Sequence, residues 1–273
     1  MNNTKMKQFC QVIMERIPEE NPQMTEVIKN NGVTRTGIVI DNMILYLDEF
    51  FRKYQENVSL EKIIQMIKTT ISSAERTMDT KNIANFVNPA EFRNIKKKIF
   101  LKVVNLEMNL DRFSVRKILN RRFLDLAVIP YVDMEIGTTE ISSLNLDFWN
   151  VSEESIFRLA TENTKSRKTE ITSFLGTLDI MTNSLTFGAS SILHCQETLK
   201  ELSDKYGSNL FLLPSSIYEF IVYPETGIDK EEEKLGLMVR EINHNEVSEE
   251  DVLSYSIYKF DRIKNCIDIV WRG

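Results

Sequence analysis

Histidine, cysteine and glycine are scarce in this chain. Its 273 residues include 2 histidines, 3 cysteines and 9 glycines. Two histidines cannot build a three-histidine zinc site, and neither a His-Glu-x-x-His nor a Cys-x-x-Cys spacing occurs. The few glycines form no Rossmann or P-loop fingerprint for binding phosphate. The sequence therefore predicts no metal site and no bound cofactor.

Long apolar runs are missing as well. No stretch approaches the roughly 20 apolar residues that a membrane helix needs, and the first helical segment lacks the apolar centre of a secretory signal. The cysteines, Cys10, Cys195 and Cys266, lie far apart, which favours a reducing compartment over a disulfide scaffold. We therefore expect a cytoplasmic protein with no membrane partner.

The charge of the chain is mildly acidic. Its 34 lysines and arginines and 40 aspartates and glutamates give a formal net charge of -6. Such a charge does not attract nucleic acid or anionic membranes over long distances. The lysine run at residues 96–98 has no interleaved aromatic residues, and we interpret it as a solvated face. Nucleic acid is therefore not an expected partner.

Apolar residues at helical spacing predict several amphipathic helices. The clearest has apolar positions at i, i+3, i+4, i+7 and i+11 from Leu60, and Ser59 is its N-cap. Gly207 supplies a left-handed C-terminal cap to another. The predicted helices span residues 6–17, 48–54, 60–71, 152–164, 195–206 and 235–242. Residues 247–250 repeat the Val-Ser-Glu-Glu helix start of residues 151–154 and predict one more capped helix.

Runs of branched and aromatic residues predict short strands. They lie at residues 27–28, 37–40, 43–47, 99–106, 123–132, 140–144, 178–182, 187–193, 256–260 and 266–271. The run at residues 99–106 also fits a buried helix. Residues 210–224 predict a strand, a turn and a second strand. Because strands and helices follow in mixed order, we expect an α+β fold with mixed, largely antiparallel sheets and packed amphipathic helices.

A polar stretch suggests how the chain divides. Residues 72–88 are polar and end at Pro89. We therefore predict an N-terminal α+β part over residues 1–88 and a main α+β part over residues 89–273. The main part is predicted to contain two sheet-helix units and a C-terminal hairpin, and one continuous module is the alternative.

The polar corner inside residues 210–224 is the first candidate site. Pro214, Ser215 and Ser216 are predicted to form the turn between two strands. A hydrolase or transferase would need one of these hydroxyls beside an imidazole such as His194 and an acid such as Glu219. Gly-x-Ser-x-Gly is absent, and serines in a Pro-Ser-Ser turn usually bond their own backbone.

Four further polar residues are candidates. Arg121 and Arg122 can grip a carboxylate or a phosphate with paired donors. Asp125 interrupts an otherwise apolar run and needs a partner if it is buried. Asn163 ends a predicted helix, where capping explains it without a ligand. The structural alternative to an anion site is a pair of surface arginines, or an arginine bonded to Asp125 or to backbone carbonyls.

Blocks of sequence along nearly the whole chain resemble a known family. They include RRFLDLAV, WNVSEE, ATENT, LPSSIYE and VREIN, at residues 121–128, 149–154, 160–164, 213–219 and 239–243, with shorter blocks at residues 30–33, 182–183 and 188–189. In these blocks the chain resembles an uncharacterised clostridial family, domain of unknown function 5688, and more distantly a family common in bacilli. The resemblance implies one continuous module from a Gram-positive anaerobe. It brings no established activity, and the histidine that many members carry is Tyr218 here.

The sequence leaves three functions open. The lack of metal, glycine-loop and histidine motifs favours a non-enzymatic binding or regulatory module with an unknown protein or small-molecule partner. A hydrolase or transferase would use the corner at residues 214–216 with Arg122 or His194 nearby. Nucleic-acid binding through residues 96–98, Arg121 and Arg122 is the weakest of the three.

Overall fold

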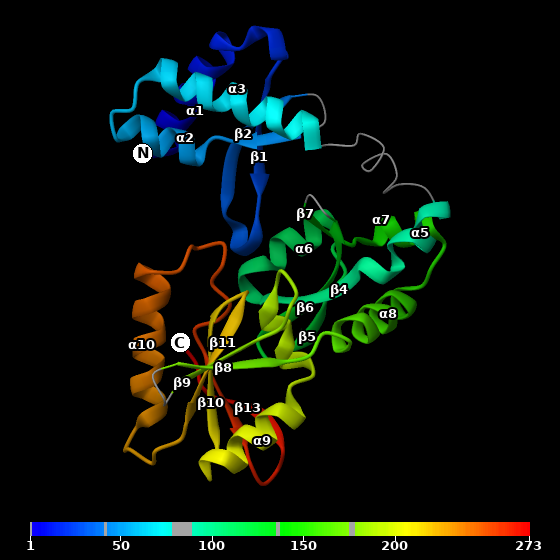
Figure 1. The fold of residues 1–273 in the computed structure, drawn as a ribbon, viewed down its shortest axis with the longest axis vertical. Helices are drawn as coiled ribbons and strands as arrows, with labels where there is room; N and C mark the ends of the chain where they lie inside the picture. The colour runs from blue at the N-terminus through cyan, green and yellow to red at the C-terminus, as the bar shows by residue number, and fades with distance from the viewer. Residues whose placement is uncertain (1, 41–42, 78–88, 135–136, 175–177) are drawn as a thin grey trace. The chain divides into compact units, whose positions relative to one another are not determined.

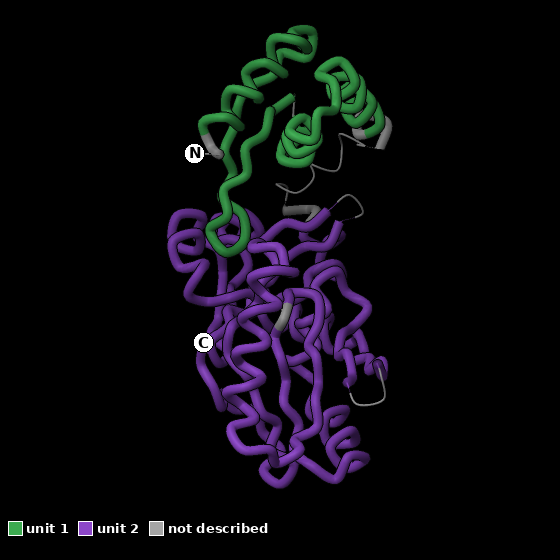
Figure 2. Tube along the Cα trace, turned by 90° about the vertical axis from the view of Figure 1, so that its left-hand side faces the viewer, with its two compact units in different colours: residues 1–85 green, residues 86–273 purple. Residues whose placement is uncertain are grey.

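The structure is a computed structural model that describes residues 2–40, 43–77, 89–134, 137–174 and 178–273 (Figure 1). The chain forms two compact units, residues 1–85 and 86–273, which Figure 2 shows in green and purple. The predicted boundary at residue 88 falls outside the described residues, and the division of the chain at that residue stays a prediction. None of the helices in the described ranges combines the length and the apolar composition that crossing a membrane requires.

The first unit places helices on a small antiparallel sheet. Its strands are β1 (Gln23–Ile28), β2 (Thr34–Ile40) and β3 (Met43–Tyr46), in the order β1-β2-β3. Its helices are α1 (Asn2–Arg16), α2 (Asp48–Gln55) and α3 (Leu60–Thr77). Ile63, Ile67 and Ile71 of α3 are buried in the same core as Ile13 of α1 and Ile38 of β2. The predicted meander and helices are therefore confirmed in this unit.

The second unit contains two sheets. The smaller one consists of β4 (Ile99–Asn105), β5 (Arg121–Phe123), β6 (Leu126–Met134) and β7 (Gly137–Glu140), all antiparallel, with β6 pairing with the other three. The short helices around it are α5 (Pro89–Ile95), α6 (Leu110–Arg116) and α7 (Ser143–Trp149). The longer helix α8 (Glu153–Lys165) packs on β4, where Thr164 Oγ1 accepts a 2.8 Å hydrogen bond from the Leu101 amide. Ser152 caps α8 as predicted.

The larger sheet is antiparallel, in the order β13-β12-β10-β11-β9-β8. Its strands are β8 (Glu170–Phe174), β9 (Leu178–Thr182), β10 (Leu210–Ser216), β11 (Glu219–Pro224), β12 (Ile257–Asp261) and β13 (Cys266–Trp271). Helix α9 (Gln196–Tyr206) lies in the core with Leu210 and Leu212, whereas α10 (Glu231–Asn245) lies against Phe211 and Leu213 (Figure 1). The two helices thus cover opposite faces of β10, and the α+β fold class is confirmed.

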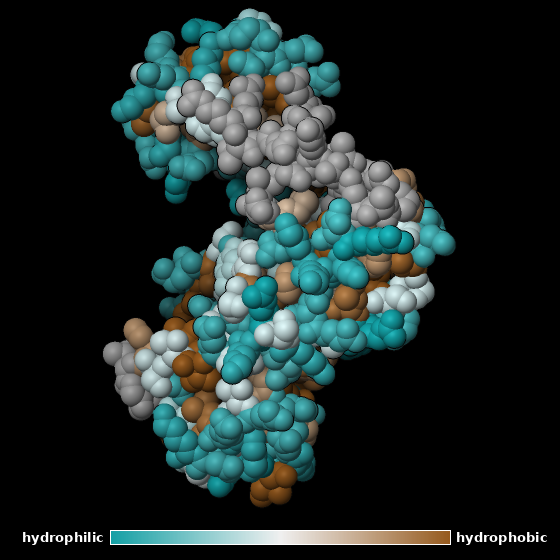
Figure 3. Space-filling model, turned by 45° about the vertical axis from the view of Figure 1, so that its right-hand side comes forward, coloured by the Kyte–Doolittle hydropathy of each residue, from teal (hydrophilic) through white to brown (hydrophobic). Residues whose placement is uncertain are grey.

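The close approach of α10 to β13 depends on one small residue. A Cβ at Gly236 would lie 2.3 Å from the ring of Trp271. Glycine is therefore the residue that lets the indole lie flat against this helix. The face of residues 86–273 that Figure 3 shows is mostly hydrophilic, with apolar side chains in separate patches.

Three predicted elements are wrong, and strand β8 and the short helices α6 and α7 were missed. The strand expected over residues 123–132 is broken, because Leu124 and Asp125 form a turn between β5 and β6. Residues 187–193 do not form a strand, because Gly188–Leu193 is a 3-10 helix, η6. A short buried apolar run has no periodicity that separates helix from strand. Residues 247–250 start no helix, since the amides of Asp251 and Val252 bond the Ser248 carbonyl in a turn. The missed strand is β8, whose polar sequence lies at the sheet edge.

Two other predictions need smaller corrections. The strand expected over residues 140–144 runs from Gly137 to Glu140, and α7 begins at Ser143. Pro214 and Ser216 belong to β10, so the turn of this hairpin lies at Ile217 and Tyr218. The register shifts between Leu213 and Ser216, and this irregularity lets a proline stand inside the sheet.

Replacing Gly188 by alanine is expected to lower the free energy of unfolding by about 3 kcal/mol, at the upper end of overpacking costs. The added methyl group would lie 2.0 Å from Thr182 Oγ1 and 2.4 Å from the Tyr218 carbonyl oxygen. Urea denaturation measures the loss. Gly227→Ala is the control, because its Cβ meets nothing within 4 Å and its positive φ costs alanine only about 1 kcal/mol. Equal losses would show that packing does not select glycine at residue 188.

Candidate functional site

Three hydroxyl groups converge on Asp125, in the turn between β5 and β6. Ser254 Oγ and Ser256 Oγ donate to Asp125 Oδ2 over 2.7 and 2.8 Å, and the Tyr258 hydroxyl donates to Oδ1 over 2.5 Å. We call Ser254, Ser256 and Tyr258 the hydroxyl trio. Each hydroxyl has one proton, and here that proton points at the carboxylate. Ser254 Oγ in turn accepts a 3.0 Å hydrogen bond from the Ser256 amide.

Burial keeps the phenol of this group protonated. Tyr258 is fully buried. Burial raises the pKa of Tyr258 well above its ordinary value, and the charge of Asp125 and its hydrogen bond raise it further. The phenol is therefore a stable donor to Asp125 across the physiological pH range.

Backbone hydrogen bonds position the segment that carries Ser254 and Ser256. The Ser254 amide donates to the Pro214 carbonyl over 3.3 Å, and the side chain of Asn243 on α10 donates to the Ser254 carbonyl over 3.0 Å. Asn105, at the end of β4, donates to the Leu253 carbonyl over 3.1 Å. The corner predicted as a site therefore contributes through its backbone, as a support for residues 252–256.

A cavity of about 650 Å³ opens beside Asp125. Asp125, Ser254 and Ser256 line it, together with Arg122 and Arg272. Arg122 Nε also donates a 2.7 Å hydrogen bond to the Leu124 carbonyl. Ligand cavities in proteins typically measure roughly 300–1,000 Å³. We call this space the Asp125 cavity. It brings two of the predicted site residues, Arg122 and Asp125, into one place.

Arg121 and Asn163 have structural partners elsewhere. Arg121 points away from Arg122 in β5, lies 2.5 Å from Glu154 and stacks 4.0 Å from the ring centroid of Phe157. Strand neighbours point to opposite faces, which separates the two arginines. Asn163 donates two 2.8 Å hydrogen bonds to the carbonyls of Lys96 and Ile99, so it ties α8 to the start of β4.

His194 and Ser216 of the predicted triad have contacts that need no catalysis. His194 Nε2 lies 2.9 Å from the Arg167 carbonyl oxygen, and burial is the main cause that lowers the pKa of His194. Ser216 Oγ accepts from the Tyr218 amide over 3.2 Å, so this serine bonds its own backbone as expected. Ser216 pairs with Glu219 across the hairpin, and Ser215 lies beside it in β10. A triad stays a prediction that these contacts do not support.

Comparison with known proteins gives this chain a family. The family of unknown function DUF5688 matches residues 6–185 and, in a second segment, residues 178–262. The chain belongs to DUF5688. The resemblance seen in its sequence blocks is therefore confirmed. No curated protein and no solved structure matches the chain. The DUF5688 match includes Asp125 and the whole hydroxyl trio.

The hydroxyl trio was missed in the sequence, although a signal exists. Ser254, Ser256 and Tyr258 alternate with Tyr255 and Ile257, and an extended chain places every second side chain on one face. A run of hydroxyl residues at a spacing of two, leading into a strand, therefore presents its donors together. Only the fold of this DUF5688 chain places Asp125 opposite them.

A second charged group lies inside the unit, away from the Asp125 cavity. Glu140 of β7 is 2.8 Å from Lys102 Nζ and 2.6 Å from Arg112 on α6. Burial alone would raise the pKa of Glu140, but the two cations and their hydrogen bonds outweigh it and lower the pKa to about 2. Lys102 also lies 4.5 Å from the ring centroid of Phe187. These contacts give the group a structural role.

Over the described residues, no set of three metal-ligating side chains comes together.

Proposed function

We propose that the protein is a non-enzymatic binding module whose ligand is a small anionic molecule in the Asp125 cavity. The observation that supports this most is the arrangement of Asp125, Ser254 and Ser256 in the wall of a cavity that Arg122 and Arg272 also line, with Tyr258 bonded to Asp125 from behind that wall. Guanidinium groups bind phosphate or carboxylate oxygens with paired, charge-assisted hydrogen bonds.

The hydrogen bonds of the wall favour binding over catalysis. A serine nucleophile needs a base to take its proton, and the base must be free to do so. Asp125 already accepts from three hydroxyls. Both of its oxygens are therefore already occupied as hydrogen-bond acceptors. The same bonds fix the positions of the serine oxygens, which suits recognition of hydroxyl or amino groups on a ligand.

The charged residues that line the Asp125 cavity indicate which class of anionic ligand fits it. Arg122 and Arg272 are balanced in the lining by Asp125 and Glu107. A ligand with one anionic group and several hydrogen-bond donors matches this mixture better than a polyanion, which the two carboxylates would repel. Sugar phosphates have this combination of groups. Binding of such a molecule would let the protein act as a regulatory module.

Titration calorimetry with ribose 5-phosphate tests this proposal. We expect wild-type protein to bind it and Arg122→Ala to bind it at least about tenfold more weakly, since a hydrogen bond to a charged group contributes about 1.5–3 kcal/mol. Arg122 is exposed, so the variant should fold. Arg121→Ala is the matched control, because the neighbouring arginine faces Glu154 and Phe157. The proposal fails if wild type does not bind, or if both variants bind equally.

A further inference from the structure

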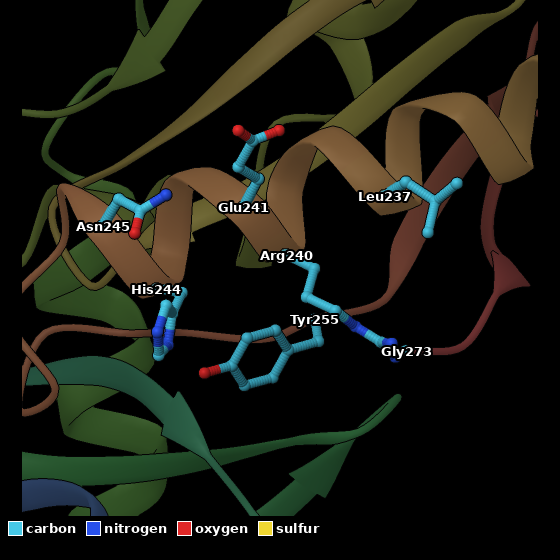
Figure 4. A pocket seen from close by; sticks show the side chains of 7 residues that line it. All are labelled: Leu237, Arg240, Glu241, His244, Asn245, Tyr255 and Gly273. Carbon is cyan, nitrogen blue, oxygen red and sulfur yellow. The ribbon is translucent and has the colours of Figure 1, made fainter.

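A second hollow adjoins the Asp125 cavity along α10. It measures about 590 Å³, and we call it the α10 groove. Leu237, Arg240 and His244 line it from the helix, and Tyr255 lines it from the segment below (Figure 4). Tyr255 and Gly273 line both hollows. The α10 groove and the Asp125 cavity are therefore neighbours that share a wall.

Tyr255 is the aromatic part of that shared wall. It stands between Ser254 and Ser256 in sequence, at a bend that precedes β12. In Figure 4 its ring lies beneath α10, with the Arg240 side chain beside it. An aromatic ring and a planar guanidinium both offer a flat surface on which another ring can stack.

We propose that the two hollows bind one nucleoside monophosphate. The phosphate would lie between Arg122 and Arg272, the ribose hydroxyls would face Ser254 and Ser256, and the base would stack on Tyr255 in the α10 groove. This inference rests on the proposed function and specifies its ligand.

The size and charge of the two hollows favour this class over others. An inorganic anion would fill only a small part of either space, whose volumes are about 650 and 590 Å³. Glu241 in the α10 groove and Asp125 in the cavity disfavour a polyanion such as a nucleic-acid strand. A purely apolar ligand would leave three arginines, Arg122, Arg240 and Arg272, without partners of opposite charge on the ligand.

Titration calorimetry with the monophosphates of adenosine, guanosine, cytidine and uridine tests the inference, with ribose 5-phosphate as the reference. We expect at least one nucleotide to bind about tenfold more tightly than ribose 5-phosphate, a gain typical of one base stacking on an aromatic ring. Tyr255→Leu should remove this gain, so that the nucleotide binds this variant no more tightly than ribose 5-phosphate binds the same variant. Tyr255→Phe keeps the ring and should keep the gain. Phe174→Leu, an exposed aromatic of the edge strand β8, is the control.

The outcomes separate the two proposals. If ribose 5-phosphate binds and no nucleotide binds more tightly, the nucleotide inference is overturned and the proposed function stands. The inference also falls if a nucleotide gains affinity but Tyr255→Leu, folded by circular dichroism, keeps that gain. If Tyr255→Leu does not fold, Tyr255→Met takes its place, and an unchanged nucleotide gain in that variant overturns the stacking geometry. If none of the anions binds to wild type, both proposals fail.

Discussion

Replacing Glu140 by alanine is expected to lower the free energy of unfolding by about 3–5 kcal/mol, the range for removing one partner of a buried ion pair. Glu140 contacts both Lys102 and Arg112, and all three side chains are almost completely buried. Without the carboxylate, two cations remain inside the unit, where burial already lowers the pKa of Lys102. Urea denaturation at neutral pH measures the loss.

A surface acid provides the control for this measurement. Glu154 lies 2.5 Å from Arg121, but its side chain is 78% exposed. Exposed ion pairs contribute about 0–1 kcal/mol, so Glu154→Ala should change stability little. Similar losses in Glu140→Ala and Glu154→Ala would contradict the view that burial makes the Glu140 contacts important.

The same carboxylate predicts how stability changes in acid. The pKa of Glu140 is about 2 in the folded protein, below the value of about 4.3 for an unfolded glutamate. A depressed pKa stabilises the fold fully above the unfolded value, and that contribution is lost as the pH falls from about 4.3 to about 2. Glu140→Ala should therefore show a shallower loss of stability than wild type over this interval.

Replacing Asp125 by alanine is expected to cost about 3 kcal/mol of stability and to abolish ligand binding. The change leaves Ser254, Ser256 and Tyr258, all buried, without their common acceptor, and an unsatisfied buried polar group costs about 1–3 kcal/mol. Three such costs are not additive, because the hydroxyls can turn toward cavity water or toward one another. Urea denaturation and calorimetry measure the two effects separately.

Tyr258 provides an independent readout of the same change. In Asp125→Ala the pKa of Tyr258 should fall, because the charge and the hydrogen bond that raise it are gone. It should stay above the ordinary value for tyrosine, since burial is the largest cause of the shift. Ultraviolet titration, with Tyr258→Phe subtracted to isolate this phenol, follows the change. An unaltered titration would show that Asp125 and Tyr258 are not coupled.

The sequence predicted secondary structure correctly where apolar residues recurred at one regular spacing along a whole segment. Apolar residues recur at helical spacing from Leu60 to Ile71, and the structure forms α3 over this segment. The strand predicted at residues 187–193 was wrong because residues 188–192 are all buried. No alternation of buried and exposed positions therefore separates a strand from a helix there. The helix predicted from residue 247 was wrong because backbone hydrogen bonds to the end of β10 hold the chain in a turn after Ser248. A capping pattern in the sequence carries no information about such bonds.

The candidate site was predicted only in part, for a related reason. The sequence indicated Asp125 as a candidate because a carboxylate within an apolar run needs a partner. It indicated Arg122 only as one of a pair of arginines. Which arginine faces the Asp125 cavity depends on how β5 pairs with β6. The partners of Asp125 lie 129 to 133 residues further along the chain. No local pattern can indicate contacts at that distance.

That sequence separation also has a kinetic consequence. Bringing Asp125 to the hydroxyl trio closes a loop of more than a hundred residues. The chain loses the entropy of this closure before the contacts of Asp125 stabilise the fold. The contacts of Asp125 should therefore form after the folding transition state, once the sheets are already paired. Variants at this residue would then accelerate unfolding and leave the rate of folding nearly unchanged. The resistance of the native state to unfolding would thus depend on the same carboxylate that shapes the cavity.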